Sequence, residues 1–185
     1  MVLTGALTMA GFGACGVPLE DHAAMTPGTD LPYELEGAPP PDTVEAAAPG
    51  GAAAVVFLLR DDSLVEVPRT VSDPTNLNGL LTELAAPLTP AETDEGLRRA
   101  LSDIGLIGGV SRTANVATVD LDPSFDELVP HEQVLALGQI VYTLTERDEV
   151  DRVRFTRDGE PITIPIASGS LVDGSVTRYD YRSLR

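Results

Sequence analysis

The first 52 residues contain no positive charge, and this limits where a folded core can lie. All 12 basic residues of the 185-residue chain are arginines, and the first of them is Arg60. Residues 16–52 contain seven prolines, three of them consecutive at 39–41, and the segment carries seven carboxylates: Glu20, Asp21, Asp30, Glu34, Glu36, Asp42 and Glu45. A self-repelling, proline-rich segment without apolar periodicity cannot bury enough surface to fold. The sequence therefore predicts a disordered tether that ends at residue 52.

The net charge of −17 bears on the class of partner. Nucleic acid and anionic lipid head groups both attract basic surfaces, so we expect neither as a partner through charge. The single cysteine excludes an intrachain disulfide. The apolar fraction of 43% is sufficient for a globular core in the rest of the chain.

Residues 1–14, MVLTGALTMAGFGA, form an uncharged apolar run that ends at Cys15. The run is too short to span a membrane as a mature helix and has the length of a signal-peptide hydrophobic region. With Gly13 and Ala14 before the cysteine, it resembles the lipobox of bacterial lipoproteins, although Phe12 stands where an aliphatic residue is usual. The resemblance implies a signal peptide over 1–14 and a lipidated Cys15 that anchors the protein to the outer face of the cell membrane. The alternative is that Cys15 is a buried small hydrophobe.

Hydrophobic periodicity divides the rest of the chain into strands and helices. The predicted strands are Ala53–Arg60, Leu64–Arg69, Ile104–Arg112, Val116–Asp122, Val150–Arg157 and an edge strand over 162–166. The predicted helices are Thr75–Ala85, a short piece over Glu92–Leu101 that begins with a capping box at Thr89–Glu92, and His131–Asp148. The Asp158-Gly159 pair predicts a tight turn. Residues 53–167 are expected to form one domain, and the polar residues 168–185 a loosely held tail.

The helix over His131–Asp148 has the clearest pattern. Val134, Leu137, Ile140, Val141 and Leu144 line one face, and Gln139 is expected largely off that face. Strands that come in hairpins and are interrupted by helices predict an α+β fold, with a mixed or antiparallel sheet and two main helices on one face. Residues 75–157 give the order α-β-β-α-β, with flanking hairpin strands.

Three motifs resemble the GerMN domain, named after a sporulation and germination protein. The segment 139–161, QIVYTLTERDEVDRVRFTRDGEP, is similar to the end of that domain, Val116–Phe125 to its central strand, and Leu77–Pro87 to its first helix. The resemblance covers Ala53–Ile166 and implies a core like the ring-building motifs of secretion and sporulation complexes. It also implies structural roles for Tyr142, Leu144, Phe155 and Gly159. This chain has one copy of the IVYTLTE-like stretch.

The resemblance implies a non-enzymatic role, because no catalytic residue is known for the family. Family members are usually lipoproteins or exported proteins, so we expect an extracytoplasmic protein-interaction or assembly module with an envelope partner or with a second copy of itself. Neither a cofactor nor a metal is expected. Arg152, Arg154 and Arg157 are expected to form a row on one side of a strand, which is a candidate for binding an acidic partner. The alternative is the solvated face of a half-buried sheet.

Two enzyme or ligand hypotheses stay open. A carboxylate-dependent envelope hydrolase would use a pair drawn from five acids: Asp103, Asp120, Asp122, Asp148 and Asp151. Binding of a cell-wall polymer or a cation is the other. Residues 120–131 superficially resemble a calcium loop, but Phe125 replaces the required glycine and His131 the required glutamate. His131 is expected to be an exposed residue in the first turn of its helix.

Overall fold

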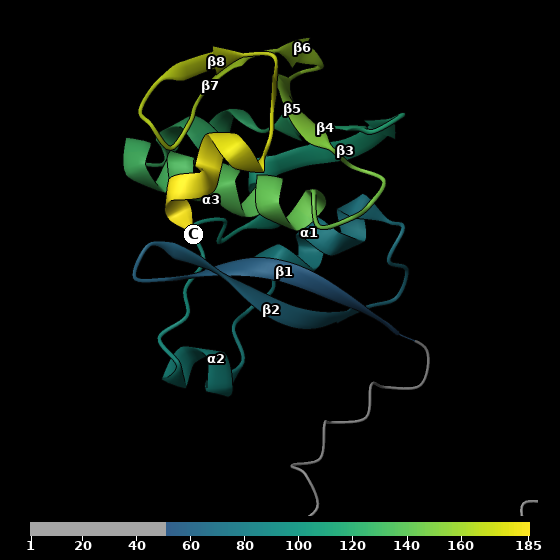
Figure 1. Cartoon of the computed structure of the whole chain (residues 1–185), viewed down its shortest axis with the longest axis vertical. Helices are drawn as coiled ribbons and strands as arrows, with labels where there is room; N and C mark the ends of the chain where they lie inside the picture. The colour runs from purple at the N-terminus through teal and green to yellow at the C-terminus, as the bar shows by residue number, and fades with distance from the viewer. Residues whose placement is uncertain (1–50) are drawn as a thin grey trace, which may run out of the picture. The chain divides into compact units, whose positions relative to one another are not determined.

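The computed structural model describes residues 51–185. Cys15, the predicted signal peptide and the predicted tether up to residue 50 lie outside the described residues, and residue 52, the predicted end of the tether, already belongs to β1. The described elements follow one another along the chain (Figure 1): β1 (Ala52–Arg60), β2 (Ser63–Val71), α1 (Leu77–Ala85), α2 (Pro90–Asp94), η1 (Ile104–Leu106), β3 (Ile107–Thr113), β4 (Val116–Leu121), η2 (Pro123–Glu127), α3 (Pro130–Leu144), β5 (Arg152–Arg157), β6 (Glu160–Pro161), β7 (Thr163–Pro165), β8 (Leu171–Asp173), β9 (Ser175–Val176) and η3 (Arg178–Leu184).

A mixed five-stranded sheet forms one layer of the domain. Strands β3 and β4 make an antiparallel hairpin, whereas β4 and β5 run parallel. Parallel neighbours need a crossover connection, and α3 supplies it. Strands β6 and β9 both pair antiparallel with β5. The succession α1-β3-β4-α3-β5 has the predicted α-β-β-α-β order, and the predicted α+β fold class is confirmed.

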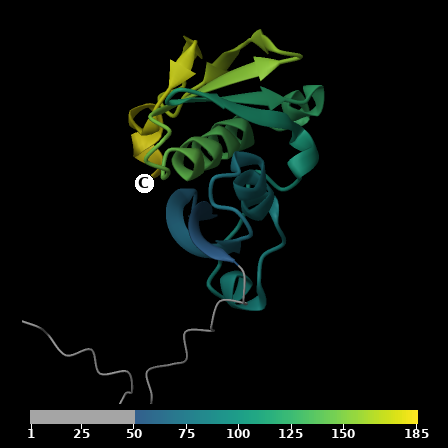
Figure 2. The ribbon, with the colours of Figure 1, turned by 90° about the vertical axis from the view of Figure 1, so that its right-hand side faces the viewer.

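The β1–β2 hairpin forms a separate layer. Helices α1 and α3 lie between this hairpin and the five-stranded sheet (Figure 2). The hairpin turns at Asp61 and Asp62, which have positive φ angles of 49° and 65°. Such a turn matches the twist of the strands that it joins. Because α3 is covered on two sides, every residue from Leu135 to Leu144 is buried.

Two predicted helices are shorter in the structure. Helix α3 ends at Leu144 rather than Asp148, and α2 ends at Asp94 rather than Leu101. The capping box predicted at Thr89 is present. Gly96 follows α2 with a φ of +72°, a conformation that ends helices and that glycine adopts without strain. The chain beyond it runs extended, so that the backbone of Arg98 exchanges two hydrogen bonds with Leu59, at 2.9 and 2.8 Å.

The buried amide of Gln139 joins α3 to two distant segments. Its Oε1 accepts hydrogen bonds from the N–H groups of Ala100 (2.8 Å) and Leu101 (3.1 Å). Its Nε2 donates to the carbonyl of Phe57 at 2.8 Å, and Thr143 Oγ1 accepts from the N–H of Phe57 at 3.0 Å. The prediction that Gln139 lies off the buried face is wrong. The hairpin covers the side of α3 that would otherwise face water.

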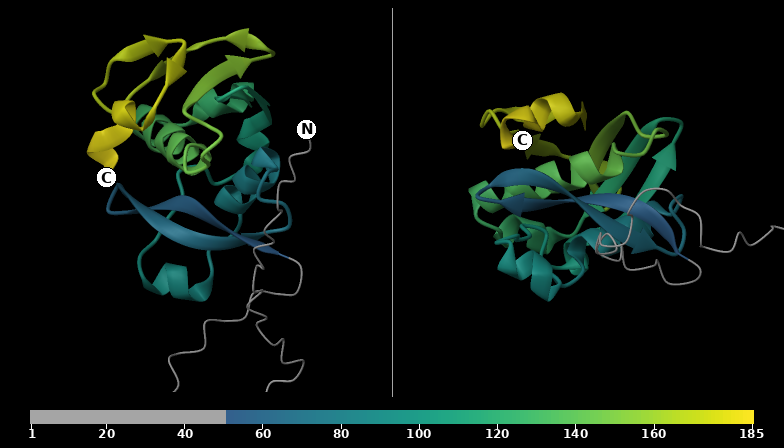
Figure 3. Two further views of the ribbon diagram at one scale, coloured as in Figure 1. Left: turned by 45° about the vertical axis from the view of Figure 1, so that its right-hand side comes forward. Right: turned by 60° about the horizontal axis from the view of Figure 1, so that its bottom comes forward.

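Residues 168–185 do not form the predicted loosely held tail. Val176 and Tyr181 are fully buried, and the Tyr181 hydroxyl donates a hydrogen bond to the carbonyl of Pro165 at 2.9 Å. Burial also raises the pKa of the Tyr181 phenol. Figure 3 shows η3 beside α3. Gly138 makes room for this contact, since a Cβ there would lie 2.6 Å from Leu184 Cδ1.

Arg178 fastens the C-terminal segment to the end of α3. Its Nη2 donates to the carbonyl of Tyr142 at 3.0 Å, and its Nε donates to Thr145 Oγ1 at 2.8 Å. The guanidinium also lies 5.2 Å from the centroid of the Tyr142 ring and pairs with Glu146. The last carbonyls of a helix lack partners within the helix and attract cations. Arg178 therefore stabilises the last turn of α3 as well as η3.

We predict that Gln139→Leu strongly destabilises the domain. The variant keeps the volume of the side chain but leaves three buried backbone groups without partners, each worth about 1–3 kcal/mol. The free energy of unfolding should fall by about 3 kcal/mol or more in urea titrations. Gln133→Leu on the same helix is the matched control, since Gln133 donates only to loop carbonyls. Equal losses in the two variants would contradict this account of Gln139.

We predict that Tyr181→Ala lowers the free energy of unfolding by about 3–5 kcal/mol, because it removes a fully buried aromatic ring. The control is Tyr179→Ala, two positions away, where 69% of the residue is exposed. That variant should change stability by less than about 1 kcal/mol. Thermal unfolding followed by circular dichroism measures both. If Tyr181→Ala were as stable as Tyr179→Ala, residues 168–185 would not belong to the cooperative core.

Candidate functional site

One face of the five-stranded sheet faces away from α1 and α3 (Figure 2). Most side chains on this face are polar. Successive strand residues point to opposite sides, so Val153 and Phe155 of β5 are fully buried while Arg152 and Arg154 are exposed. Strand register brings the other members of this side together. We call it the outer face, and it consists of Ser111, Thr113, Val116, Thr118, Asp120, Arg152, Arg154, Thr156 and Ser175.

The predicted arginine row is divided by the sheet. Arg152 and Arg154 lie on the outer face, and the side chain of neither makes a hydrogen bond or an ion pair with another residue in 51–185. Arg157 lies on the opposite side of β5, where it forms a bidentate ion pair with Asp126 at 2.7 and 2.8 Å. The prediction of one row on one side of the strand is therefore wrong for Arg157. A spacing of three reverses the side in a strand, a signal that was already present in the sequence.

Asp120 organises the end of the outer face next to Arg154. Its Oδ1 accepts hydrogen bonds from Thr156 Oγ1 at 2.7 Å and from the N–H of Gly159 at 3.0 Å. These hydrogen bonds, that of Thr156 first, lower the pKa of the Asp120 carboxyl. Gly159 has the positive φ, +80°, that the predicted tight turn requires. No local pattern in the sequence indicates this arrangement, because it depends on the pairing of β4 with β5.

The other carboxylates considered for hydrolysis have local partners. Asp103 accepts from the N–H of Gly105 at 2.8 Å, and Asp122 accepts from the N–H of Ser124 at 2.9 Å, so each caps a short helix. Asp151 accepts from the side-chain amide of Asn115. Hydrogen bonds from Ser124 lower the pKa of Asp122. A general acid needs a raised pKa, so neither Asp122 nor Asp120 is suited to donate a proton at neutral pH.

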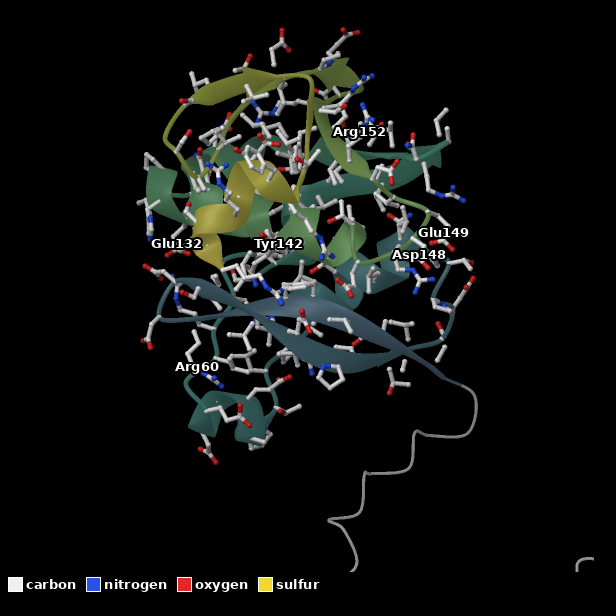
Figure 4. The ribbon with its side chains drawn as sticks, viewed as in Figure 1. Arg60, Glu132, Tyr142, Asp148, Glu149 and Arg152 are labelled. Carbon is white, nitrogen blue, oxygen red and sulfur yellow. The ribbon has the colours of Figure 1, made fainter. Side chains whose placement is uncertain are left out.

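Asp148 belongs to the turn between α3 and β5. Figure 4 shows it with Glu149 at a distance from Arg152 on the sheet. Arg60, the last residue of β1, lies in the lower part of the same view.

His131 lies in the first turn of α3, as predicted, and its side chain is 63% exposed. Its Nε2 lies 3.0 Å from Asp62 Oδ2 in the β1–β2 turn. Phe125, in the segment that resembled a calcium loop, is buried in the core. Across residues 51–185, no three side chains of His, Cys, Asp or Glu gather as they would around a metal ion. The helices of this same region are also too short or too polar to cross a membrane.

Comparisons with known proteins agree with this architecture. The sequence model of the Germane family, described as "Sporulation and spore germination", matches residues 55–163. Lipoprotein LpqB from Cutibacterium acnes (strain DSM 16379 / KPA171202) is 30% identical over 107 residues, which are 57% of this chain and 17% of LpqB. The chain therefore matches only a minor part of LpqB.

Two solved structures from Bacillus subtilis are also similar. The tandem GerMN domains of the sporulation protein GerM align with a TM-score of 0.54 at 15% identity, covering 70% of this chain and 47% of theirs. The first GerMN domain of GerM aligns with a TM-score of 0.49 at 16% identity, covering 69% of this chain and 98% of that domain. The tandem structure supports the α+β fold found here.

The family match covers more than half of the chain and contains α1, β3, β4, α3 and β5, the elements that build the core. It includes the motifs at Val116–Phe125 and Ile140–Glu146 on which the resemblance was based. Tyr142, Leu144 and Phe155 are buried, as the resemblance implied. The chain belongs to the Germane family of sporulation and spore germination domains.

Proposed function

We propose that this chain is an extracytoplasmic lipoprotein held at the outer face of the cell membrane through Cys15. An apolar, uncharged run precedes Gly13, Ala14 and Cys15 in the order of a lipobox. LpqB, part of which is similar to this chain, is named as a lipoprotein. Two or three acyl chains provide stable anchoring, because each buried methylene contributes about 0.8 kcal/mol.

The folded domain acts as a protein-interaction module rather than as an enzyme. The observation that carries this proposal is the unpaired state of Arg152 and Arg154 on the outer face. Most other described arginines already bind a carboxylate or a carbonyl, as Arg157 binds Asp126. Arginine forms bidentate contacts with carboxylates and is enriched at interface hot spots. An acidic protein surface in the cell envelope therefore complements the outer face.

Cys15→Ser is predicted to abolish anchoring. Cells that express the full chain are fed a clickable fatty acid, and label on the protein is measured together with its distribution between membrane and medium. The unchanged chain should carry label and sediment with membranes, whereas the variant should carry none. Because Cys15 is the only cysteine, the matched control is Ser63→Ala in the folded domain, which should keep the label. Absence of label on the unchanged chain would refute the anchor.

A photo-cross-linking residue introduced at Thr118, beside Arg154, is predicted to capture a partner in intact cells. The double variant Arg152→Glu/Arg154→Glu should lower the yield of that adduct by about tenfold, since it replaces attraction by repulsion across the interface. Arg60→Glu, at the end of β1, changes one charge elsewhere on the surface and should leave the yield unchanged.

The mass of the adduct identifies the kind of partner. A heterologous adduct supports an envelope protein, and an adduct of twice the chain's mass indicates self-association through the same face. An adduct whose yield is insensitive to the arginine variants, or no adduct at all, would contradict the proposed role of the outer face.

A further inference from the structure

The C-terminal segment presents an aromatic ring whose position the interaction proposal does not explain. Tyr179 is 69% exposed, although Tyr181 in the same short helix is fully buried. The Arg182 guanidinium carbon lies 3.9 Å from the centroid of the Tyr179 ring. Arg182 Nη1 also donates to the carbonyl of Tyr179 at 2.9 Å, which holds the guanidinium in place. One face of the ring is therefore supported, and the large exposure leaves the other face free.

A cavity of about 480 Å³ adjoins this ring. Its size lies within the range of small-molecule sites, about 300–1,000 Å³. Besides Tyr179, its walls come from the β7–β8 turn and from η3: Ile166, Ala167, Ser168, Asp180, Arg182 and Ser183. None of these residues belongs to the outer face of the sheet.

The two walls are fixed relative to each other. The N–H of Ala167 donates to the carbonyl of Asp180 at 3.2 Å, which joins the β7–β8 turn to η3. Within the turn, the N–H of Ile166 donates to the carbonyl of Ser170 at 2.9 Å. The hydroxyl of the buried Tyr181 donates a hydrogen bond to the carbonyl of Pro165, which also holds η3 next to the end of β7. The site is therefore pre-formed, and a ligand would not have to order it.

The polar groups in the cavity suit a neutral ligand with several hydroxyls. Asp180 and Arg182 offset each other's charge. The Oδ2 atom of Asp180 accepts from the N–H and the hydroxyl of Thr177, at 2.7 and 3.0 Å, while Oδ1 makes no hydrogen bond with a residue in 51–185. The Oδ1 atom can therefore accept a hydrogen bond from a hydroxyl of a ligand. Ser168 and Ser183 add two hydroxyls that both donate and accept.

We propose that this cavity binds a pyranose unit of a neutral saccharide. The apolar C–H face of a pyranose stacks on the free face of Tyr179, while its hydroxyls bind Asp180 and the two serines; Arg182 supports the ring from its other face. The Tyr ring offers an apolar body with a polar edge, which suits a ligand of mixed character. The site lies beyond residue 163, where the family match ends, so it is a feature of this chain's C-terminal segment. It does not depend on the proposed role of the outer face.

Nuclear magnetic resonance of the full chain with isotopically labelled tyrosine tests this proposal. The chain has four tyrosines, and Tyr179→Phe identifies the ring signal of Tyr179. Titration with the tetramer of β-1,4-linked N-acetylglucosamine, and in parallel with cellotetraose, should shift the Tyr179 signal saturably and leave that of buried Tyr181 in place. The monomer N-acetylglucosamine distinguishes a site for a free sugar from one that needs a polymer.

Affinity is then measured calorimetrically with three variants. Tyr179→Ala should weaken binding at least about tenfold through loss of stacking, whereas Tyr179→Phe should stay within about twofold. Ser183→Ala removes one hydroxyl and should have an intermediate effect. The fold is monitored by the unchanged signal of Tyr181.

Three results would overturn the proposal. The first is no saturable shift of Tyr179 with either tetramer up to about 10 mM. The second is an unchanged affinity in Tyr179→Ala, and the third is a shift confined to other tyrosines. A failure of the outer-face cross-linking would leave all of these measurements unaffected, so the two proposals can fail separately.

Discussion

The amide of Gln139 is the contact on which the arrangement of the layers depends. It satisfies two N–H groups of the segment after α2 and one carbonyl of β1, from a position in the middle of the buried part of α3. Hydrogen bonds of this kind contribute about 1 kcal/mol each, but leaving the buried groups unpaired costs more. The hairpin can therefore cover α3 only where Gln139 and Thr143 meet Phe57. This requirement fixes a single position of the β1–β2 hairpin relative to α3, which hydrophobic contact alone would not do.

The side-chain amide of Asn78 likewise binds the backbone at one edge of the five-stranded sheet. The N–H of Val110 in the edge strand β3 donates to Asn78 Oδ1 at 3.1 Å, and Asn78 Nδ2 donates to the carbonyl of Val110 at 3.2 Å. Asn78 thus occupies the position that a neighbouring strand would take. Unpaired edge strands promote pairing with other chains, and natural proteins cover them. Asn78 covers only this position of the edge, and the two partner sites proposed above lie on side-chain surfaces, the outer face and the Tyr179 cavity.

The elements with strong periodicity could be predicted from the sequence because the residues that indicate each element all lie within it. The hairpins, the capping box at Thr89 and the turn at Gly159 all depend on residues a few positions apart. The side of β5 on which Arg157 lies also follows from local spacing, because a residue three positions away points to the opposite side of a strand. The hydrogen bonds of Asp120, in contrast, join β4 to β5 and the following turn. No pattern within one segment indicates them.

The sequence by itself determined the type of each main element, the α-β-β-α-β order and the family, because periodicity and turn residues act within short segments. It also determined the acidic, proline-rich character of the first 52 residues. Only the tertiary structure decided which polar residues are buried. Gln139 and Tyr181 are predicted to be exposed until a second layer covers them, and Arg157 is paired only because the fold brings Asp126 beside it. Whether a side chain is buried depends on how two elements pack together, so one strand or helix by itself does not determine it.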